Sequence, residues 1–288
     1  MRADLIQETV TVLEEYGFNV LVYLHSCFDI AAQRKDLTLL VKVLENIDGF
    51  REEYADELKK LSASLNASPL VIGEKSKAET LVNNVIYDRY GIPVITLGSL
   101  QSTMIGAYPE KVSSKGRVIA EIDGETLRKA REKKHVTAEQ LADELNLTKE
   151  SIYLYENDKI RTKYEIAKRI ESFLNANLIK AKKPFQSFAF REEHQSGLGR
   201  RLMLMDFDVS SFHRMNFDLF AKDEKNSVVI KQDMAKHPEK VAEFSDFFKT
   251  FFAVVSNEKN ADVPVVTEEE LKSVSNKKDF LKLIKEKR

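Results

Sequence analysis

Two aspartate and lysine pairs with the same spacing are the residues of this sequence best suited to chemistry. Asp29 precedes Lys42 by 13 residues, and Asp218 precedes Lys231 by the same interval. Each aspartate follows a phenylalanine, and each lysine follows two apolar residues, as expected near the ends of short strands. An aspartate at such a place can give oxygen to a cation such as Mg²⁺. It can also cap a turn or form an ion pair with the lysine across a sheet.

The order of elements around each pair resembles the restriction-endonuclease and Holliday-junction-resolvase superfamily, in which a strand ends near an aspartate and an acid-x-lysine strand follows. In that superfamily two carboxylates hold Mg²⁺, which polarises the phosphate and generates the attacking hydroxide. The second acid is replaced by Leu40 in one copy and by Val229 in the other, and neither side chain can ligate a hard cation. We therefore expect two relic ion pairs with no metal, no cofactor and no cleavage, unless Glu45 is recruited.

The elements that must position the first pair predict an α/β lobe with a mixed sheet. Apolar spacing and the stop at Gly17 predict a helix over residues 4–15. The other elements follow from their periodicity: strands over 18–23, 28–32, 38–44, 70–72 and 93–96, and helices over 51–65 and 78–90. The stretch from Tyr108 to Arg117 is polar and contains proline and glycine, so it fits a linker.

The C-terminal part repeats the first lobe. Four short segments recur in order, and they are Phe18-Asn19-Val20 with Phe207-Asp208-Val209, Phe28-Asp29-Ile30 with Phe217-Asp218-Leu219, Leu40-Val41-Lys42 with Val229-Ile230-Lys231, and Pro93-Val94-Ile95-Thr96 with Pro264-Val265-Val266-Thr267. The second copy is shorter by about the length of the helix expected over 78–90. These matches predict a duplicated lobe, with chance similarity of short hydrophobic strands as the alternative.

Between the lobes, residues 125–175 predict four short helices, because their apolar residues recur at helical spacings. Thr137 followed by Gln140 has the form of a capping box at a helix start. Asn146 is suited to end that helix because it tolerates a left-handed backbone, and Thr148 starts the next one. Two helices therefore meet across a tight turn.

These paired caps, from Leu127 to Asn157, resemble the helix-turn-helix (HTH) family of phage repressors and Cro, the XRE family. The resemblance implies a structural pair between Arg128 and Glu156. It also implies DNA contacts from the caps, the polar face of the second helix and the basic residues after it, namely Thr137, Gln140, Thr148, Lys149, Glu150, Ser151, Tyr153, Lys159 and Arg161. Ala138 and Asp158 replace the glutamine and the glycine usual in the family. A helical bundle without groove contact is the alternative.

The composition of the 288 residues fits a globular protein, with 43% hydrophobic and 32% charged residues and a net charge of −1. Any DNA contact must therefore come from a local basic patch. Cys27 is the single cysteine, which excludes an intramolecular disulfide, and no stretch approaches the roughly 20 apolar residues of a membrane span. We expect a cytoplasmic protein. The five histidines show no metal-site spacing, and Gly197-Leu198-Gly199 fits a solvated turn.

We expect a fold of the α/β plus all-α class, with two related restriction-endonuclease-like α/β lobes flanking a four- to five-helix phage-repressor-type HTH domain. The expected domains are residues 1–115, an inactive α/β lobe; residues 121–182, the HTH domain; and residues 185–288, the shortened second lobe. This arrangement resembles a family of archaeal HTH-type transcriptional regulators.

The expected function is sequence-specific binding of double-stranded DNA at an operator by a homodimer, with no enzyme activity and no membrane partner. The basal transcription machinery is a further candidate partner. Two other functions stay open, a metal-dependent structure-specific DNA nuclease and a non-catalytic protein-interaction scaffold.

Overall fold

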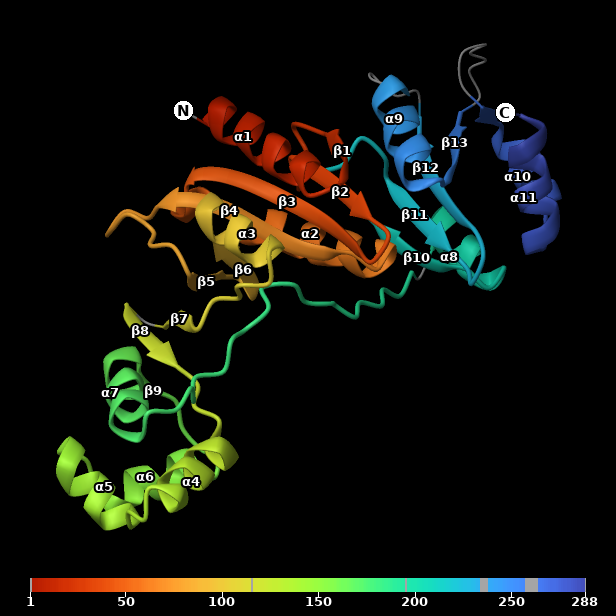
Figure 1. The fold of residues 1–288 in the computed structure, drawn as a ribbon. Helices are drawn as coiled ribbons and strands as arrows, with labels where there is room; N and C mark the ends of the chain where they lie inside the picture. Colours follow the sequence, from red (N-terminus) through yellow and green to blue (C-terminus); the bar gives the residue numbers. More distant parts are fainter. Residues whose placement is uncertain (1, 115, 195, 234–237, 257–263, 288) are drawn as a thin grey trace. The chain divides into compact units, whose positions relative to one another are not determined.

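The computed structural model describes residues 2–114, 116–194, 196–233, 238–256 and 264–287 (Figure 1). The chain forms two compact units. The first unit contains Met1–Leu44, Gly49–Leu70 and Gln186–Arg288, and the second contains Glu45–Asp48 and Val71–Phe185. The pair Asp29 and Lys42 and the pair Asp218 and Lys231 both lie in the first unit. The helical segment expected over residues 125–175 lies in the second.

The N-terminal part of the first unit is an antiparallel meander between two helices. Its elements are α1 (Arg2–Glu15), β1 (Asn19–Val22), β2 (Ile30–Arg34), β3 (Leu37–Asn46), α2 (Glu52–Leu65) and the first residues of β4 (Ser68–Lys75). Strand β1 pairs with β2 and β2 with β3, both antiparallel. Helix α2 ends at Asn66, whose left-handed backbone (φ 52°) closes the last turn. All six elements lie where the sequence predicts them, within a few residues.

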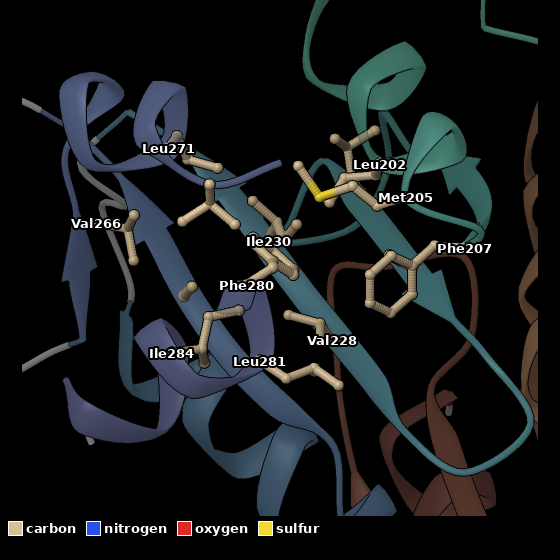
Figure 2. Close-up of a cluster of buried hydrophobic side chains, with 14 of the residues drawn as sticks. Leu202, Met205, Phe207, Val228, Ile230, Val266, Leu271, Phe280, Leu281 and Ile284 are labelled. Atoms are coloured by element: carbon tan, nitrogen blue, oxygen red, sulfur yellow. The ribbon is translucent and has the colours of Figure 1, made fainter. Parts of the chain in front are cut away.

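Within its described residues, the C-terminal part of the first unit is a five-stranded sheet with four helices. Its elements are α8 (Gly197–Leu204), β10 (Asp208–Ser211), β11 (Leu219–Lys222), β12 (Ser227–Gln232), α9 (Pro238–Phe248), β13 (Phe251–Val255), β14 (Val265–Val266), α10 (Glu268–Ser273) and α11 (Lys277–Glu286). Phe280 and Ile284 of α11 pack on Ile230 and its neighbours to form the core drawn in Figure 2. The prediction of a solvated turn at Gly197-Leu198-Gly199 is wrong, because these residues begin α8.

The two α/β lobes share one topology and one register. The C-terminal strand order β10-β11-β12-β13-β14 corresponds to β1-β2-β3-β4-β6. Asn19 of β1 pairs with Gln33 of β2, and Asp208 of β10 pairs with Lys222 of β11. Each residue of the second pair lies 189 positions after its counterpart in the first, so the register is the same. The amide of Tyr23 donates to the carbonyl of Asp29 at 2.8 Å, and Phe212 donates to Asp218 at the same distance. The expected fold class, with two related lobes, is therefore confirmed.

The two lobes pack against each other within the first unit. The Glu57 carboxylate of α2 accepts hydrogen bonds from the amides of His213 (2.7 Å) and Arg214 (2.8 Å) in the loop between β10 and β11. The ring of Phe244 in α9 lies 5.8 Å from the ring of Tyr23 and 4.9 Å from that of Phe217. A buried carboxylate and an aromatic cluster therefore join the lobes. Glu57 is buried, so these bonds compensate its desolvation.

In the second unit, the strands follow the order β4-β6-β5-β7-β8-β9. The elements are η1 (Ile47–Gly49), the remainder of β4, β5 (Val85–Arg89), β6 (Ile92–Ile95), α3 (Leu97–Met104), β7 (Lys111–Ser114), β8 (Arg117–Ala120), α4 (Gly124–Lys133), α5 (Ala138–Leu145), α6 (Lys149–Glu156), β9 (Thr162–Lys163) and α7 (Tyr164–Leu174). Helix α3 begins at Thr96, whose side chain caps the amide of Ser99.

The prediction of a helix over residues 78–90 is wrong. Residues 85–89 form β5, which pairs antiparallel with β6 and parallel with β7. Tyr90 and Gly91, both with positive φ (55° and 79°), make the two-residue hairpin turn between β5 and β6. Leu81, Val85 and Ile86 fit the spacing of a helix as well as that of a strand, so their apolar spacing alone does not distinguish the two structures. The segment that the second lobe lacks therefore contains a strand.

The prediction of a linker between Tyr108 and Arg117 is also wrong, because this stretch contains β7 and the start of β8. The two strands pair antiparallel, with Val112 opposite Ile119, and β8 then pairs with β9. Strand β9 lies between α6 and α7, so the sheet leads directly into the helical segment. A polar composition predicts a loop here, but a short exposed hairpin has the same composition.

The helical segment contains the four helices expected from the sequence, α4, α5, α6 and α7 (green in Figure 1). Their apolar faces enclose a core that includes Leu127, Leu141, Ile152 and Ile170, all fully buried. The segment is closed at its ends, because the amide of Asp123 donates to the carbonyl of Leu178 and the amide of Lys180 to that of Glu121.

Candidate nucleic-acid interface

Capping residues fix the starts of α5 and α6 and the turn between the two helices. The Thr137 hydroxyl accepts from the Gln140 amide (3.1 Å), and the Gln140 side chain accepts from the Thr137 amide (2.8 Å). Asn146 ends α5 with a left-handed backbone, and Thr148 caps α6 through the amide of Ser151 (3.1 Å). These contacts satisfy amides that a helix start leaves without partners, and they fix the geometry of the two helices.

We predict that Thr148→Ala destabilises the helical segment by about 1 kcal/mol, because the first-turn amides of α6 lose their side-chain acceptor. Thr148→Ser keeps an acceptor oxygen and is the matched control, with a smaller expected loss. Urea unfolding followed by circular dichroism measures the difference. An equal loss in both variants would mean that the methyl group, and not the cap, stabilises this site.

The exposed face of α6 carries the side chains expected to read DNA. Tyr153 is 62% exposed, and Lys149 and Glu150 are exposed as well. Lys149 Nζ lies 3.6 Å from Glu139, with both side chains about two-thirds exposed, so this pair is worth little in water. Lys149, Glu150 and Tyr153 can therefore turn toward a ligand at low cost.

The other residues expected at DNA are placed differently. Thr137, Gln140, Thr148 and Ser151 use their polar atoms in the caps, and the Ser151 hydroxyl lies 2.8 Å from that of Thr148. Lys159 is exposed just after α6, and Arg161 is half-exposed with its Nε 3.5 Å from Glu121. The structure brings all nine residues to α5, α6 and the loop that follows. Four of the nine residues therefore use their polar groups in the helix caps, and the other five expose theirs to solvent.

Glu156 at the end of α6 holds two arginines of α4. Arg131 contacts it through two bonds, Nε to Oε1 at 2.6 Å and Nη2 to Oε2 at 3.3 Å. Arg128, the partner expected from the sequence, contacts Oε2 at 3.4 Å only, and its side chain is 48% exposed against 14% for Arg131. The hydrogen bond to Glu156 also raises the pKa of Arg131. The main partner of Glu156 is therefore Arg131, which the family resemblance does not predict.

A glycine lets α4 approach the end of α6. A Cβ atom at Gly124 would lie 2.5 Å from the carbonyl oxygen of Glu156, which is closer than atoms can pack. Asp158 takes a left-handed conformation (φ 54°), and its side chain accepts from the Gly124 amide at 3.1 Å. This bond links the loop after α6 to the start of α4 and gives Asp158 a role that glycine would lack.

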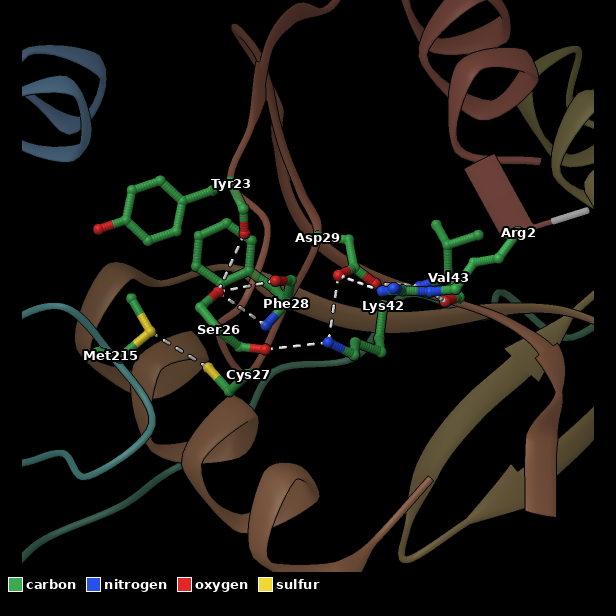
Figure 3. A network of polar contacts seen from close by, with 9 residues as sticks. All are labelled: Arg2, Tyr23, Ser26, Cys27, Phe28, Asp29, Lys42, Val43 and Met215. Atoms are coloured by element: carbon green, nitrogen blue, oxygen red, sulfur yellow. Dashed lines mark hydrogen bonds and ion pairs between the residues drawn. The ribbon is translucent and has the colours of Figure 1, made fainter. Parts of the chain in front are cut away.

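The nuclease-like pair Asp29 and Lys42 is enclosed by hydrogen bonds (Figure 3). Asp29 Oδ1 accepts from Arg2 Nη2 (2.6 Å) and Lys42 Nζ (3.2 Å), and Oδ2 accepts from the Val43 amide (2.9 Å). The carboxylate is fully buried, and the second-acid position, Leu40, is buried as well. The guanidinium of Arg2 therefore occupies the charge-balancing place beside Asp29. Arg2 lies 27 residues from Asp29 in the sequence, so local spacing could not predict this contact.

The pair Asp218 and Lys231 is built in the same way but is more open. Lys231 Nζ lies 2.9 Å from Asp218 Oδ1, and Oδ2 accepts from the Gln232 amide at 2.6 Å. The Asp218 side chain is 31% exposed, and no arginine contact accompanies it within the described residues. Glu45, the alternative acid of the first lobe, is held by Lys75 at 2.7 Å, which lowers its pKa.

Among the described residues no group of three histidine, cysteine, aspartate or glutamate side chains is arranged to hold a metal ion. His237 lies outside the described part of the chain. Cys27 is fully buried against Met215 (Sγ to Sδ 3.5 Å), and burial raises the pKa of its thiol. Within the same described ranges, no helix has the length and apolar character that crossing a membrane requires.

Comparisons with known proteins agree with both parts of the chain. Residues 2–109 match the PD-(D/E)XK superfamily domain, and residues 127–179 match a helix-turn-helix. No solved structure matches the chain.

Several archaeal proteins that are provisionally named HTH-type transcriptional regulatory proteins resemble this chain over its full length. The relative from Methanothermobacter thermautotrophicus is 31% identical and aligns over 100% of this chain and 97% of its own length. The relative from Archaeoglobus fulgidus is also 31% identical, with 100% and 99% covered, and that from Methanocaldococcus jannaschii is 28% identical, with 99% and 97% covered. This protein therefore belongs to the family of archaeal HTH-type transcriptional regulatory proteins, with a PD-(D/E)XK superfamily domain ahead of its helix-turn-helix.

Proposed function

We propose that this protein is a transcriptional regulator that binds duplex DNA at an operator through α6. The observation that carries the proposal is the capped turn between α5 and α6, which leaves Lys149, Glu150 and Tyr153 exposed on one helix face. A helix presented in this way fits the major groove, where its side chains can reach base edges. Lys159 and Arg161 follow it and can neutralise phosphates.

Selection of bound duplexes from a random pool tests this function directly. We expect an enriched sequence whose binding weakens steeply with salt, because phosphate contacts release counterions. The spacing of enriched half-sites reports the number of recognition helices that engage at once. A pool without enrichment would contradict operator binding and favour the protein-interaction scaffold.

We further propose that two chains bind together, so that two copies of α6 enter successive major grooves about one helical turn apart. Each chain carries one helix-turn-helix, and a palindromic site with that half-site spacing requires two. The basal transcription machinery is a further proposed partner of the regulator. Analytical ultracentrifugation of the complex with a selected duplex gives the number of chains bound.

Metal-dependent cleavage is the second candidate function, since the PD-(D/E)XK fold is a nuclease fold. We propose that this protein does not cleave DNA, because Asp29 is enclosed by Arg2, Lys42 and the Val43 amide and Leu40 replaces the second acid. Supercoiled, branched and linear DNA incubated with Mg²⁺ or Mn²⁺ should stay intact. Cutting that Asp29→Asn abolishes would overturn this expectation.

A further inference from the structure

Two adjoining cavities lie in the first unit, around the start of β10. Their volumes are about 560 and 630 Å³, and both are lined by Arg191, Met203, Asp208 and Lys222. The first also touches the end of α2 and the segment 188–192, and the second touches the turn between β11 and β12. Cavities of this size commonly hold a small organic ligand. A ligand that spans both would meet the four shared residues.

Lys222 brings a half-buried positive charge to both cavities. Its Nζ donates to the carbonyls of Ala63 and Ser64 near the end of α2, each at 3.0 Å. An ammonium group has three donors, so one remains available for a ligand. Burial lowers the pKa of Lys222, and the charge of Asp208 opposes this effect only in part. An anionic group at the third donor would stabilise the charged form of Lys222.

Arg191 and Asp208 bring two further charges that the fold leaves open. Both residues are exposed, and neither forms an ion pair with a residue in the described ranges. Glu192, the remaining acid of the first cavity, is already engaged, since it accepts from the Ser211 hydroxyl at 2.6 Å. The first cavity therefore offers a ligand two cations, Lys222 and Arg191, and the carboxylate of Asp208.

The charges of the lining balance in each cavity. The first contains the cations Arg191 and Lys222 and the acids Glu192 and Asp208. The second contains as many acids as bases, and they are Arg191, Lys222, Lys225, Lys277, Asp206, Asp208, Asp223 and Glu224. A simple anion would be repelled by the acids, and a simple cation by the bases. The lining therefore favours a ligand that carries one charge of each sign.

The wall formed by residues 188–192, on the trace that leads into α8 in Figure 1, is tied to the sheet. Glu192 accepts from the amide of Ser211 at 2.9 Å, and Nε2 of His194 lies 3.3 Å from the carbonyl oxygen of Val209. Both contacts are made to β10, which is the first strand in the order of its sheet. The wall is therefore held in place without a ligand, which lowers the entropy cost of binding.

We propose that these cavities bind a free α-amino acid with an apolar side chain, which acts as an effector. Its carboxylate accepts from Lys222 and Arg191, its ammonium donates to Asp208, and its side chain contacts Phe188 and Met203 of the lining. The wall segment follows the helical segment in the chain, so a ligand here bears on the connection between the two units. The effector role rests on the proposed binding of DNA, whereas the binding site does not.

Isothermal titration calorimetry of the full chain without DNA tests the site. The probes are L-leucine, L-methionine and L-phenylalanine, each compared with its N-acetyl derivative, which lacks the ammonium, and its methyl ester, which lacks the carboxylate. At least one amino acid should bind, and both of its derivatives should bind roughly tenfold or more weakly, because each loses a charge-assisted hydrogen bond. Binding of none of the three, or equally tight binding of a derivative, would overturn the proposal.

Arg191→Gln and Asp208→Asn test the assigned contacts. Both residues are exposed, so folding should be unaffected, and each variant should weaken binding of the amino acid by roughly tenfold or more. Lys222→Met should weaken it further, but it also removes the donor to two carbonyls of α2, so the two exposed positions decide the case if it folds poorly. The matched control is Lys278→Gln, an exposed cation of α11 outside both linings. If Arg191→Gln and Asp208→Asn bind like this control, the site is wrong.

A second arm tests the effector role and keeps it separate from the proposed function. The affinity of the full chain for a selected duplex is measured with and without the amino acid that binds. It should change in the natural protein and stay constant in Arg191→Gln, because coupling between two sites requires the ligand to be bound. Equal affinity in the natural protein with and without the ligand would overturn the effector role. If the chain binds no duplex, the proposed function and the effector role fail together, and the calorimetry still decides whether the site exists.

Discussion

Replacing Glu156 by glutamine is expected to destabilise the helical segment by about 3–5 kcal/mol, because it leaves the largely buried Arg131 without its counter-charge. A loss of this size is comparable to the whole stability of a small domain. Urea unfolding followed by circular dichroism and by the fluorescence of a probe on α6 would measure it, and binding of a selected duplex should fall in parallel.

Arg128→Gln is the matched control for Glu156→Gln. Its side chain is 48% exposed and its contact with Glu156 is 3.4 Å, so the expected loss is below about 1 kcal/mol. If Arg128→Gln destabilises the segment as much as Glu156→Gln does, the pair implied by the family resemblance is the important one. The shorter Arg131 contact would then be secondary.

The double substitution Lys149→Ala with Tyr153→Ala is expected to abolish the preference for a selected operator over random duplex. Both side chains are exposed and make no contribution to the core, so folding should be unaffected. Removing a side chain that reads a base costs about 1–3 kcal/mol of discrimination, which for two side chains is a factor on the order of 30 or more. Competition binding with selected and random duplexes measures this ratio.

The control for this double variant is Lys133→Ala with Glu144→Ala, which changes two exposed residues of α4 and α5. It should keep the preference for the operator. Equal loss in both double variants would mean that the preference does not depend specifically on this face of α6. Retained preference in Lys149→Ala with Tyr153→Ala would exclude this face of α6 as the reading surface.

Local rules predicted the helical segment well, because its contacts are close in sequence. Thr137, Gln140, Asn146 and Thr148 act within four residues of their partners, and their residue types permit few other roles. The same rules predicted the duplicated lobe, since equal spacing survives in Asp29 with Lys42 and in Asp218 with Lys231.

Contacts between distant residues could not be predicted in this way. The bond from Arg2 to Asp29 depends on where α1 packs, and Arg131 competes with Arg128 only once α4 and α6 are in place. The segment over 78–90 was mistaken for a helix because its apolar spacing fits two structures. Pairing with β6 and β7 decided between them, and that pairing is not visible in the segment itself.

The contact between the two lobes has a consequence for how this protein could evolve. Glu57 of α2 corresponds, through the shared turn at Asn66 and Lys249, to Lys240 of α9. Glu57 binds the backbone of the opposite loop, whereas Lys240 lies 5.9 Å from the ring of Tyr23. If the two lobes were identical chains in a symmetric dimer, the same residue would have to make both of these contacts. Covalent linkage makes the lobe pairing independent of protein concentration and frees each half to acquire its own chemistry.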